Sequence, residues 1–306
     1  MQRRSVVSAV AGALAGAGLI ATETAAHDKE KGRPAKTPPP AFISTDDGVH
    51  IFYKDWGKGT PVVFVHAWAL HSDFWEYAMM RLAGEGFRCV AHDRRGHGRS
   101  SEPGRGFDYD RLADDLAGVI EALDLRGITL VGHSMGGGEV IRYLSRHGAK
   151  RVARAVLIAP TAPMIVKTPD YPEGVDKAAL DGLRAALLRD RAKWIGDSFA
   201  PFWAGGASPE LMEWGQRMVL QCSLKAMVDA THVMTETDFR AELRRITVPT
   251  LIVHGTADRS IPIKFGRLAA SLVPGSRIEE YEGAPHGLPI THGERLHRDL
   301  LAFMKG

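Results

Sequence analysis

The sequence predicts an α/β fold in which a mostly parallel β-sheet is flanked by helices and carries an inserted helical lid. Short apolar runs alternate with helical patterns from residue 43 to the end of the chain, as in sheets whose parallel strands are joined through helices. The run Val62–Val65 is continuously apolar, as expected for a strand buried on both faces. The alternation stops over residues 161–244, where the patterns are helical, and resumes at residue 250. An insertion in this position predicts a lid over the carboxyl edge of the sheet, where open α/β sheets bind ligands.

The individual elements follow in chain order. Tyr109–Leu123 gives the clearest pattern, because Leu112 and Leu116 fall on one stripe of a helix. The other elements expected before the insertion are strands over Ile51–Trp56, Pro61–His66, Phe87–Asp93, Ile128–Gly132 and Val152–Ala159, and helices over Asp73–Ala83 and Gly136–His147. Those expected after it are strands over Thr250–His254 and Arg277–Tyr281, and helices over Ile263–Leu272 and His292–Met304.

Composition restricts the class of protein. The 306 residues are 44% hydrophobic and 25% charged, which is enough for one fully packed core. The 39 basic and 36 acidic residues are spread evenly, so no stripe of Lys and Arg predicts a nucleic-acid partner. Cys89 and Cys222 are too few for a disulfide scaffold and lack the spacing of a metal site, so we expect free thiols and no metal or other cofactor. A homo-oligomer is compatible with the sequence.

The N-terminus has the pattern of an export signal. Arg3 and Arg4 precede an uncharged, weakly hydrophobic stretch over residues 5–22, and small residues follow up to Ala26, which is typical of a twin-arginine signal. The glycines of this stretch make it a poor spanning helix, so we expect no stable membrane anchor after processing. The sequence therefore predicts an export signal over 1–26, a disordered, charged and proline-rich linker over 27–41, and a folded domain over 42–306. The mature protein is then expected in the periplasm or outside the cell.

Residues 132–136 carry the pattern Gly-x-Ser-x-Gly between an apolar strand and a helix. This context allows a sharp turn that exposes Ser134 at a helix N-terminus. A serine hydroxyl attacks a carbonyl group once a neighbouring base takes its proton, so Ser134 is the predicted nucleophile. Its oxyanion needs two N–H donors, which we predict at the amides of Met135 and of Trp68, the latter in the loop after the strand ending at His66.

The base, and the acid that orients it, are expected later in the chain in the order acid, then histidine. Asp258 and His286 each follow a predicted strand, so both are expected at the same sheet edge as Ser134. His286 can accept the serine proton while Asp258 holds the imidazole tautomer. The competing residues lie inside a strand, at the last helix or in the lid: His254, His292, His297, Asp170 and Asp176.

Two further groups of residues have no assigned chemistry. The segment DRRGHGRS, residues 93–100, can clamp a substrate, bind an anion or form a loop held by its own hydrogen bonds, and we favour the last. The aromatic side chains of the insertion are expected in the lid core, with an apolar pocket if some face the sheet; these are Trp194, Phe199, Phe202, Trp203 and Trp214.

From Phe42 onward the chain resembles the cofactor-free haloperoxidase group of α/β-hydrolases, which includes bacterial aryl esterases and perhydrolases. The segments that carry the resemblance are HAWALHSDFW (66–75), GHSMGGGEVIRYLSRHGAKRVARAVLIAP (132–160), TVPTLIVHGTADRSIPI (247–263) and GAPHGLPITH (283–292). The resemblance implies the α/β-hydrolase fold and a serine hydrolase that cleaves small carboxylic esters or lactones through an acyl-enzyme. It also implies peracid formation from a carboxylic acid and peroxide as a side activity, without haem or metal. Matched residue by residue, it places the triad on Ser134, Asp258 and His286, and the oxyanion amides on Trp68 and Met135.

The chain departs from this group at two positions. Ala67 stands where the group has Gly, and Ala69 where members strong in perhydrolysis have Pro. If residue 67 needs a positive φ, Ala costs about 1 kcal/mol there and shifts the oxyanion loop. Ala69 leaves the loop less constrained, so we expect weak perhydrolysis. The indole of Trp68 is expected to shorten the acyl side of the pocket and so to favour short esters.

Two other functions fit the same fold. A hydrolase of carbon–carbon bonds would use the same triad with a polar site for a carboxylate, but the lid candidates Arg184, Arg189 and Arg191 are expected to be solvated. A non-catalytic ligand-binding protein needs none of the triad. Dehalogenases and epoxide hydrolases need a carboxylate in place of Ser134 and are excluded.

Overall fold

The computed structural model describes residues 41–204 and 206–306. The export signal predicted over 1–26 and, apart from Ala41, the linker predicted over 27–41 lie outside the described residues. Within the described part, eight strands form one sheet in the order β1-β2-β4-β3-β5-β6-β7-β8. Their bounds are β1 Phe42–Ser44, β2 His50–Gly57, β3 Pro61–Val65, β4 Arg88–His92, β5 Ile128–His133, β6 Val152–Ile158, β7 Thr250–Gly255 and β8 Arg277–Tyr281. The β1–β2 and β2–β4 pairs are antiparallel and the remaining neighbours are parallel, so the sheet is mostly parallel, as predicted.

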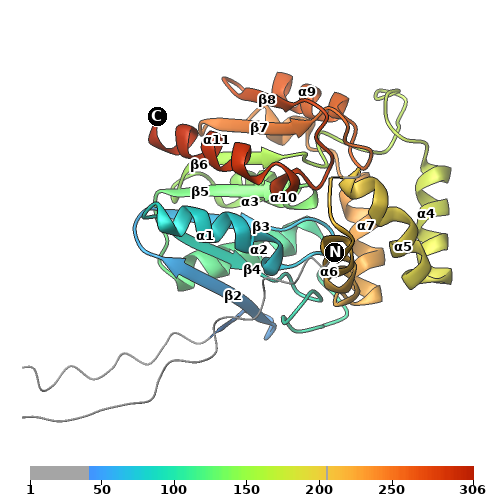
Figure 1. Cartoon of the computed structure of the whole chain (residues 1–306), viewed down its shortest axis with the longest axis horizontal. Helices are drawn as coiled ribbons and strands as arrows, with labels where there is room; N and C mark the ends of the chain where they lie inside the picture. The colour runs from blue at the N-terminus through green and yellow to red at the C-terminus, as the bar shows by residue number, and fades with distance from the viewer. Residues whose placement is uncertain (1–40, 205) are drawn as a thin grey trace, which may run out of the picture. The chain divides into compact units, whose positions relative to one another are not determined.

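The two faces of the sheet carry separate apolar cores, because successive strand residues point in opposite directions. Val62 and Phe64 belong to the core that includes α1 (Glu76–Gly84) and α11 (Gly293–Lys305). Val63 and Val65 belong to the core that includes α2 (Tyr109–Ala122), α3 (Met135–His147) and α9 (Ile263–Leu272). The sheet thus lies between two layers of helices (Figure 1), which explains why the sequence of β3 is continuously apolar.

The insertion between β6 and β7 is largely helical. It contains α4 (Lys177–Arg189), α5 (Arg191–Trp203), α6 (Pro209–Leu220), α7 (Leu224–Glu236) and α8 (Arg240–Leu243). Helices α4 to α7 gather beyond the ends to which the parallel strands point (Figure 1), where a lid is predicted. The segment before α4 is an exception to the predicted helical pattern, because Val166 and Val175 form a β-bridge there.

Most predicted elements are present, with ends shifted by a residue or two. Helix α9 and strand β8 have the predicted bounds. The predicted helix 73–83 begins instead with a 3₁₀ turn, η1 (Ser72–Trp75), whose first amide donates to the carboxylate of Asp93 at 2.8 Å. The edge strand β1 and the short helix α10 (Leu288–Thr291) are not predicted by the sequence pattern.

Both cysteines are free and buried, as predicted. Burial raises the pKa of the Cys89 thiol to about 12, so this thiol is protonated at neutral pH and a poor nucleophile. In the described ranges, no helix is long and apolar enough to span a membrane. The same ranges hold no group of three or more His, Cys, Asp or Glu side chains that can bind a metal ion.

Candidate active site

Ser134 lies in the sharp turn between β5 and α3. Its backbone has φ 56° and ψ −119°, which is a strained conformation for a residue with a Cβ and is typical of a serine nucleophile at this position. The flanking glycines permit the turn: a Cβ on Gly132 would overlap the carbonyl oxygen of Gly136, and a Cβ on Gly136 would overlap that of Val65. The Ser134 amide donates to the Ile158 carbonyl at 2.8 Å, which ties the turn to β6. The Gly-x-Ser-x-Gly spacing therefore reflects close backbone contacts.

Asp258 and His286 form a buried pair at the carboxyl ends of β7 and β8. Oδ2 of Asp258 lies 2.6 Å from Nδ1 of His286. The other carboxylate oxygen accepts the backbone N–H groups of Ser260 and Ile261, each at 2.8 Å. Because an ionised carboxylate can only accept hydrogen bonds, Nδ1 of His286 must carry its proton and Nε2 is left as the acceptor. This is the tautomer that a general base requires.

His286 also contacts His133 of β5 and Phe202 of the lid. Nε2 of His133 lies 3.0 Å from the carbonyl oxygen of His286, and the two rings are 4.8 Å apart. Burial, and then the charge of His286, lower the pKa of His133 well below its usual value, so His133 is neutral and donates from Nε2. The Phe202 ring of the lid meets the His286 ring edge-on at 5.4 Å. His286 is therefore positioned by both the sheet and the lid.

Three of the competing residues have other partners. Nε2 of His254 lies 2.8 Å from the carbonyl oxygen of Ile261, so this histidine supports the loop that carries Asp258. Asp170 forms an ion pair with Arg240 at 2.7 Å, and Asp176 one with Lys167 at 3.2 Å. The structure thus brings Asp258, and neither lid carboxylate, to His286.

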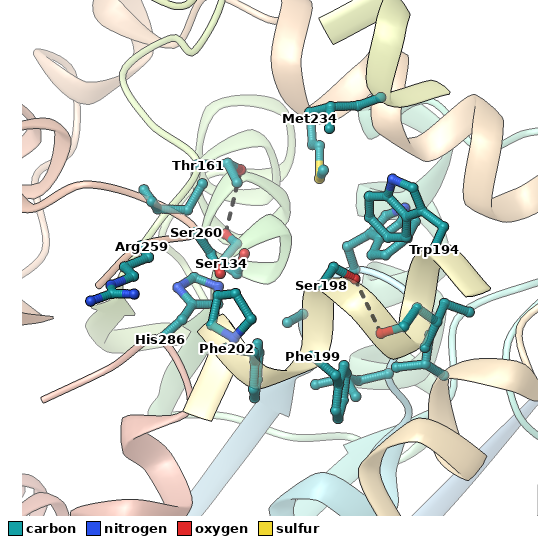
Figure 2. Close-up of a pocket in the computed structure, with 18 residues that line it drawn as sticks. Ser134, Thr161, Trp194, Ser198, Phe199, Phe202, Met234, Arg259, Ser260 and His286 are labelled. Atoms are coloured by element: carbon teal, nitrogen blue, oxygen red, sulfur yellow. Dashed lines mark hydrogen bonds between the residues drawn. The ribbon is translucent and has the colours of Figure 1, made fainter. Parts of the chain in front are cut away.

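A cavity of about 330 Å³ lies between the sheet edge and the lid, and both Ser134 and His286 line it. Figure 2 shows these two side chains beside each other, with Phe202 of α5 next to His286 and with Trp194 and Phe199 of the same helix further across the space. Trp68 also lines the cavity, and its indole N–H donates to the Met227 carbonyl at 2.9 Å. The lining is mainly apolar, so the cavity suits a small substrate with one reactive polar group.

Comparison with known proteins identifies the fold family. The family described as the alpha/beta hydrolase fold matches residues 60–293. The chain belongs to this family. A non-heme haloperoxidase of Rhodococcus erythropolis is 41% identical over 271 residues, covering 86% of this chain and 99% of that protein. A bifunctional esterase/perhydrolase of Acinetobacter calcoaceticus is 42% identical over 274 residues, covering 86% of this chain and 99% of that protein.

Solved structures agree with this placement. An esterase from Exiguobacterium antarcticum has a TM-score of 0.85 at 33% identity, covering 87% of this chain and 99% of that one. A bromoperoxidase from Bacillus anthracis has a TM-score of 0.84 at 34% identity, with the same coverage. The predicted resemblance to the haloperoxidase and esterase group of α/β-hydrolases is therefore confirmed.

In this α/β-hydrolase the unusual backbone of the loop after β3 is at Ala69, and the condition on which strain at Ala67 depended, a positive φ, is not met. Ala69 has φ 58°, whereas Ala67 is not among the residues with positive φ. The Leu70 amide donates to the Ala67 carbonyl at 3.3 Å, which closes a turn with Ala69 at the third position. That position has a positive φ in type II turns. Ala67 therefore carries none of the strain that a positive φ would impose.

The arginines of the lid also differ from expectation. Arg184 is buried, and its guanidinium donates to Thr235 Oγ1 at 2.5 Å and to Asp181 Oδ1 at 2.7 Å. Arg191 is half-buried and donates to the Cys222 carbonyl at 3.1 Å, whereas Arg189 is exposed as expected. Because Arg184 and Arg191 are already bonded within the lid, they offer no ready site for a substrate carboxylate.

The segment 93–100 of this hydrolase is largely held by its own hydrogen bonds, as favoured from the sequence. The Asp93 carboxylate accepts the Arg99 amide at 2.9 Å and the Arg99 Nε at 2.8 Å. The guanidinium of Arg94 reaches out of the segment to the Ala67 carbonyl, in the loop after β3, and to Glu139 of α3. Sequence reasoning misses this role, since Glu139 lies 45 positions further along the chain and no local pattern links the two residues.

Proposed function

We propose that this α/β-hydrolase cleaves small carboxylic esters or lactones through an acyl-enzyme on Ser134. The observation that carries the proposal is the 2.6 Å contact between Asp258 and His286 Nδ1, beside a pocket lined by both His286 and Ser134. That contact leaves His286 Nε2 free to act as a base beside the serine hydroxyl.

The reaction follows from these groups. His286 takes the proton of Ser134 as its Oγ attacks the substrate carbonyl, and the negative charge that develops on the carbonyl oxygen is stabilised by the amides of Trp68 and Met135. The imidazolium, stabilised by Asp258, then protonates the leaving alcohol. Water, deprotonated by His286, releases the acid and restores Ser134. All groups required for this sequence belong to the chain itself.

Peracid formation is proposed as a side activity of the same acyl-enzyme. A relative of this chain is described as a bifunctional esterase/perhydrolase, and hydrogen peroxide can replace water in the second half of the reaction. Peroxide has a second O–H group that needs an acceptor once the first donates to His286. The turn at Ala69, with φ 58°, fixes which way the Trp68 carbonyl faces, and we expect this turn to make perhydrolysis the weaker activity.

A reagent and a substrate panel test the main proposal. We expect a fluorophosphonate to label the wild-type protein at Ser134 and to leave the Ser134→Ala variant unlabelled. p-Nitrophenyl esters and γ- and δ-lactones should be hydrolysed by the wild type, and the variant should lose several powers of ten in kcat. Hydrolysis of a vinylogous 1,5-diketone in preference to every ester would instead favour the carbon–carbon bond hydrolase. A protein that neither reacts with the reagent nor turns over the panel would be the non-catalytic binder.

We also propose that residues 1–26 direct export through a twin-arginine route and that the mature protein acts outside the cytoplasm, without a stable membrane anchor. The proposal rests on the sequence pattern Arg3-Arg4 followed by an uncharged stretch. Sequencing the N-terminus of protein isolated from its native cell should give a start close to His27. A soluble cytoplasmic protein that retains Met1 or Gln2 would refute export.

A further inference from the structure

Arg94 and Glu139 form an ion pair that the proposed reaction does not use. Both are almost fully buried, with 1% of the Arg94 side chain and none of the Glu139 side chain exposed. Nε of Arg94, in the loop after β4, donates to Oε2 of Glu139 in α3. Removing two charges from water is costly, and a buried pair is often no more stabilising than apolar side chains of the same size. The pair is therefore better explained by the groups that it holds in place than by a contribution to the stability of the fold.

The Arg94 side chain holds the backbone of the oxyanion loop. Its Nη2 donates to the His66 carbonyl, and its Nη1 donates to the Ala67 carbonyl at 3.2 Å. The backbone amide of Arg94 donates to His66 Nε2 at 3.0 Å, and His66 Nδ1 lies 2.8 Å from the same Ala67 carbonyl. Burial, and then the charge of Arg94, lower the pKa of His66 well below its usual value, so the ring is neutral and donates from Nδ1. With the Leu70 amide at 3.3 Å, the Ala67 carbonyl oxygen thus receives three donors, two of them from the side chains of Arg94 and His66.

The bonds from Arg94 and His66 favour one direction of the Trp68 amide. The Ala67 carbonyl and the Trp68 N–H belong to one peptide unit, in which a trans, planar geometry makes the two groups point in opposite directions. Drawing the carbonyl toward Arg94 and His66 therefore turns the Trp68 N–H away from them. The positive charge of Arg94 also polarises this peptide, which makes the N–H a stronger donor.

Glu139 connects the same arginine to the second donor. It lies on α3 one helical turn after Met135, whose amide is the other predicted oxyanion donor. The carbonyl of Met135 accepts a hydrogen bond from the buried Tyr109 hydroxyl at 3.2 Å. The Arg94–Glu139 pair is thus a direct link between the segment that carries the Trp68 amide and the helix that carries the Met135 amide.

We propose that Arg94, anchored by Glu139, is a positioning residue that sets the Trp68 amide relative to the Met135 amide in the oxyanion site. The inference rests on the proposed function, since it assigns a role in stabilising the oxyanion of that reaction. Arg94 does not touch the substrate; it acts through the Ala67–Trp68 peptide. The neighbouring Arg95 provides a contrast: it is also buried, and it pairs with Asp115 and Asp47, remote from the oxyanion loop in sequence.

The test removes the pair while sparing the fold. Arg94→Met with Glu139→Met leaves no unpaired buried charge, and Arg95→Met with Asp115→Leu is the matched control on the same loop. Each protein is assayed on p-nitrophenyl acetate for kcat and KM. Each is also assayed with two inhibitors: an alkyl trifluoromethyl ketone, which adds to the serine and places an oxyanion in the site, and the corresponding trifluoromethyl alcohol, which does not.

If the proposal holds, the Arg94/Glu139 variant loses on the order of 10²-fold in kcat, comparable to the loss of one oxyanion donor, with KM little changed. The ketone should bind more weakly in parallel with kcat, whereas the affinity for the alcohol should stay the same. The Arg95/Asp115 control variant should keep the wild-type kcat and KM and the wild-type affinity for both inhibitors. Wild-type kcat in the Arg94/Glu139 variant, or an equal loss of ketone and alcohol binding, would overturn the proposal.

A second variant, Arg94→Lys, tests the positioning role of Arg94 if the paired variant does not fold. Arg94→Lys keeps a charge opposite Glu139, but a single ammonium group cannot reproduce the planar fork that reaches Glu139 and two carbonyls at once. We expect about a 10-fold loss of kcat with a matching loss of ketone affinity. Full wild-type activity in the Arg94→Lys variant would refute the positioning role of Arg94. A wild-type protein that hydrolyses no ester would refute the proposed function itself. A loss of activity confined to the variants would leave the proposed function intact.

Discussion

Nδ1 of His286 lies 2.6 Å from Oδ2 of Asp258, although the two residues are 28 positions apart in the chain. Their strands, β7 and β8, are parallel neighbours, so both residues leave the sheet at the same edge. The carboxylate is further fixed by the amides of Ser260 and Ile261, which hold its orientation. The pair therefore selects one imidazole tautomer before any substrate binds.

Asp258→Asn tests this relationship. An amide can donate to Nδ1 and so stabilise the tautomer in which Nε2 carries the proton, where it cannot accept one from Ser134. We expect kcat on p-nitrophenyl acetate to fall by about 10⁴-fold with little change in the folded structure. Asp176→Asn, at a lid carboxylate that pairs with Lys167, is the control and should keep its activity. The opposite result, with only Asp176→Asn inactive, would show that the acid is misassigned.

The acyl-chain preference should depend on Trp68. Its indole is fixed by the bond to the Met227 carbonyl and lies edge-on to Trp194, with ring centroids 5.6 Å apart, so it cannot easily move aside for a longer chain. A methylene that does not fit costs about 1–3 kcal/mol, so acetate should exceed hexanoate by one or two powers of ten in kcat/KM.

Trp68→Ala should narrow this ratio, because the substitution keeps the backbone amide while removing the indole. Trp214→Ala, in which the lost ring contacts Tyr77, should leave the ratio as it is. Equal wild-type rates on the two esters would contradict the role given to Trp68.

Acid should destabilise the fold through buried neutral histidines. Burial lowers the pKa of His97 to about 3 in the folded protein, whereas an unfolded histidine has a pKa near 6.5. Between these values the unfolded chain binds more protons, so the free energy of unfolding should fall as pH decreases from 6.5 toward 3. The slope from this one residue approaches about 1.4 kcal/mol per pH unit.

Urea titrations at pH 7.5 and 4.5 measure the effect. His97→Asn should reduce the difference in unfolding free energy between the two pH values. His50→Asn, at an exposed histidine, should not reduce it. Identical pH dependence in wild type and His97→Asn would show that His97 does not contribute to the acid sensitivity.

The residues that sequence reasoning locates are those whose environment is encoded locally. Ser134 is identified because Gly132 and Gly136 are forced by backbone contacts, and α2 because its apolar residues repeat with helical spacing. Asp258 and His286 are found because each follows an apolar strand. The three-residue β1 is missed, since an exposed edge strand of this length carries no periodic pattern.

Other features depend on contacts distant in sequence. Two alanines flank Trp68, and their sequence gives no reason to assign the positive φ to Ala69, which lies in the turn closed by the hydrogen bond from Leu70 to Ala67. Arg184 is expected in solvent because arginines in lid helices usually are, yet Thr235 and Asp181 accept its hydrogen bonds in the folded lid. The partner of Arg94 likewise comes from a different helix.

Ala69→Pro should change the balance between hydrolysis and perhydrolysis. Proline fixes φ near −65° and cannot adopt the φ of 58° found at Ala69, so the peptide between Trp68 and residue 69 has to turn over. The peptide that carries the Trp68 N–H is a different one, held through the Ala67 carbonyl by Arg94 and His66. We therefore expect ester hydrolysis to be largely kept, while the Trp68 carbonyl moves and becomes available to accept the second O–H of peroxide.

The measurement is a pair of rates on one preparation, p-nitrophenyl acetate hydrolysis and peracetate formation from acetate and peroxide. The ratio of peracetate formation to hydrolysis should rise by roughly tenfold or more in Ala69→Pro, corresponding to one added hydrogen bond of about 1.4 kcal/mol in the peroxide step. Ala69→Gly is the matched control, because glycine adopts a positive φ without strain and keeps the turn, so its ratio should equal that of the wild type. If proline leaves the ratio unchanged, or glycine raises it equally, the orientation of the Trp68 carbonyl does not limit perhydrolysis.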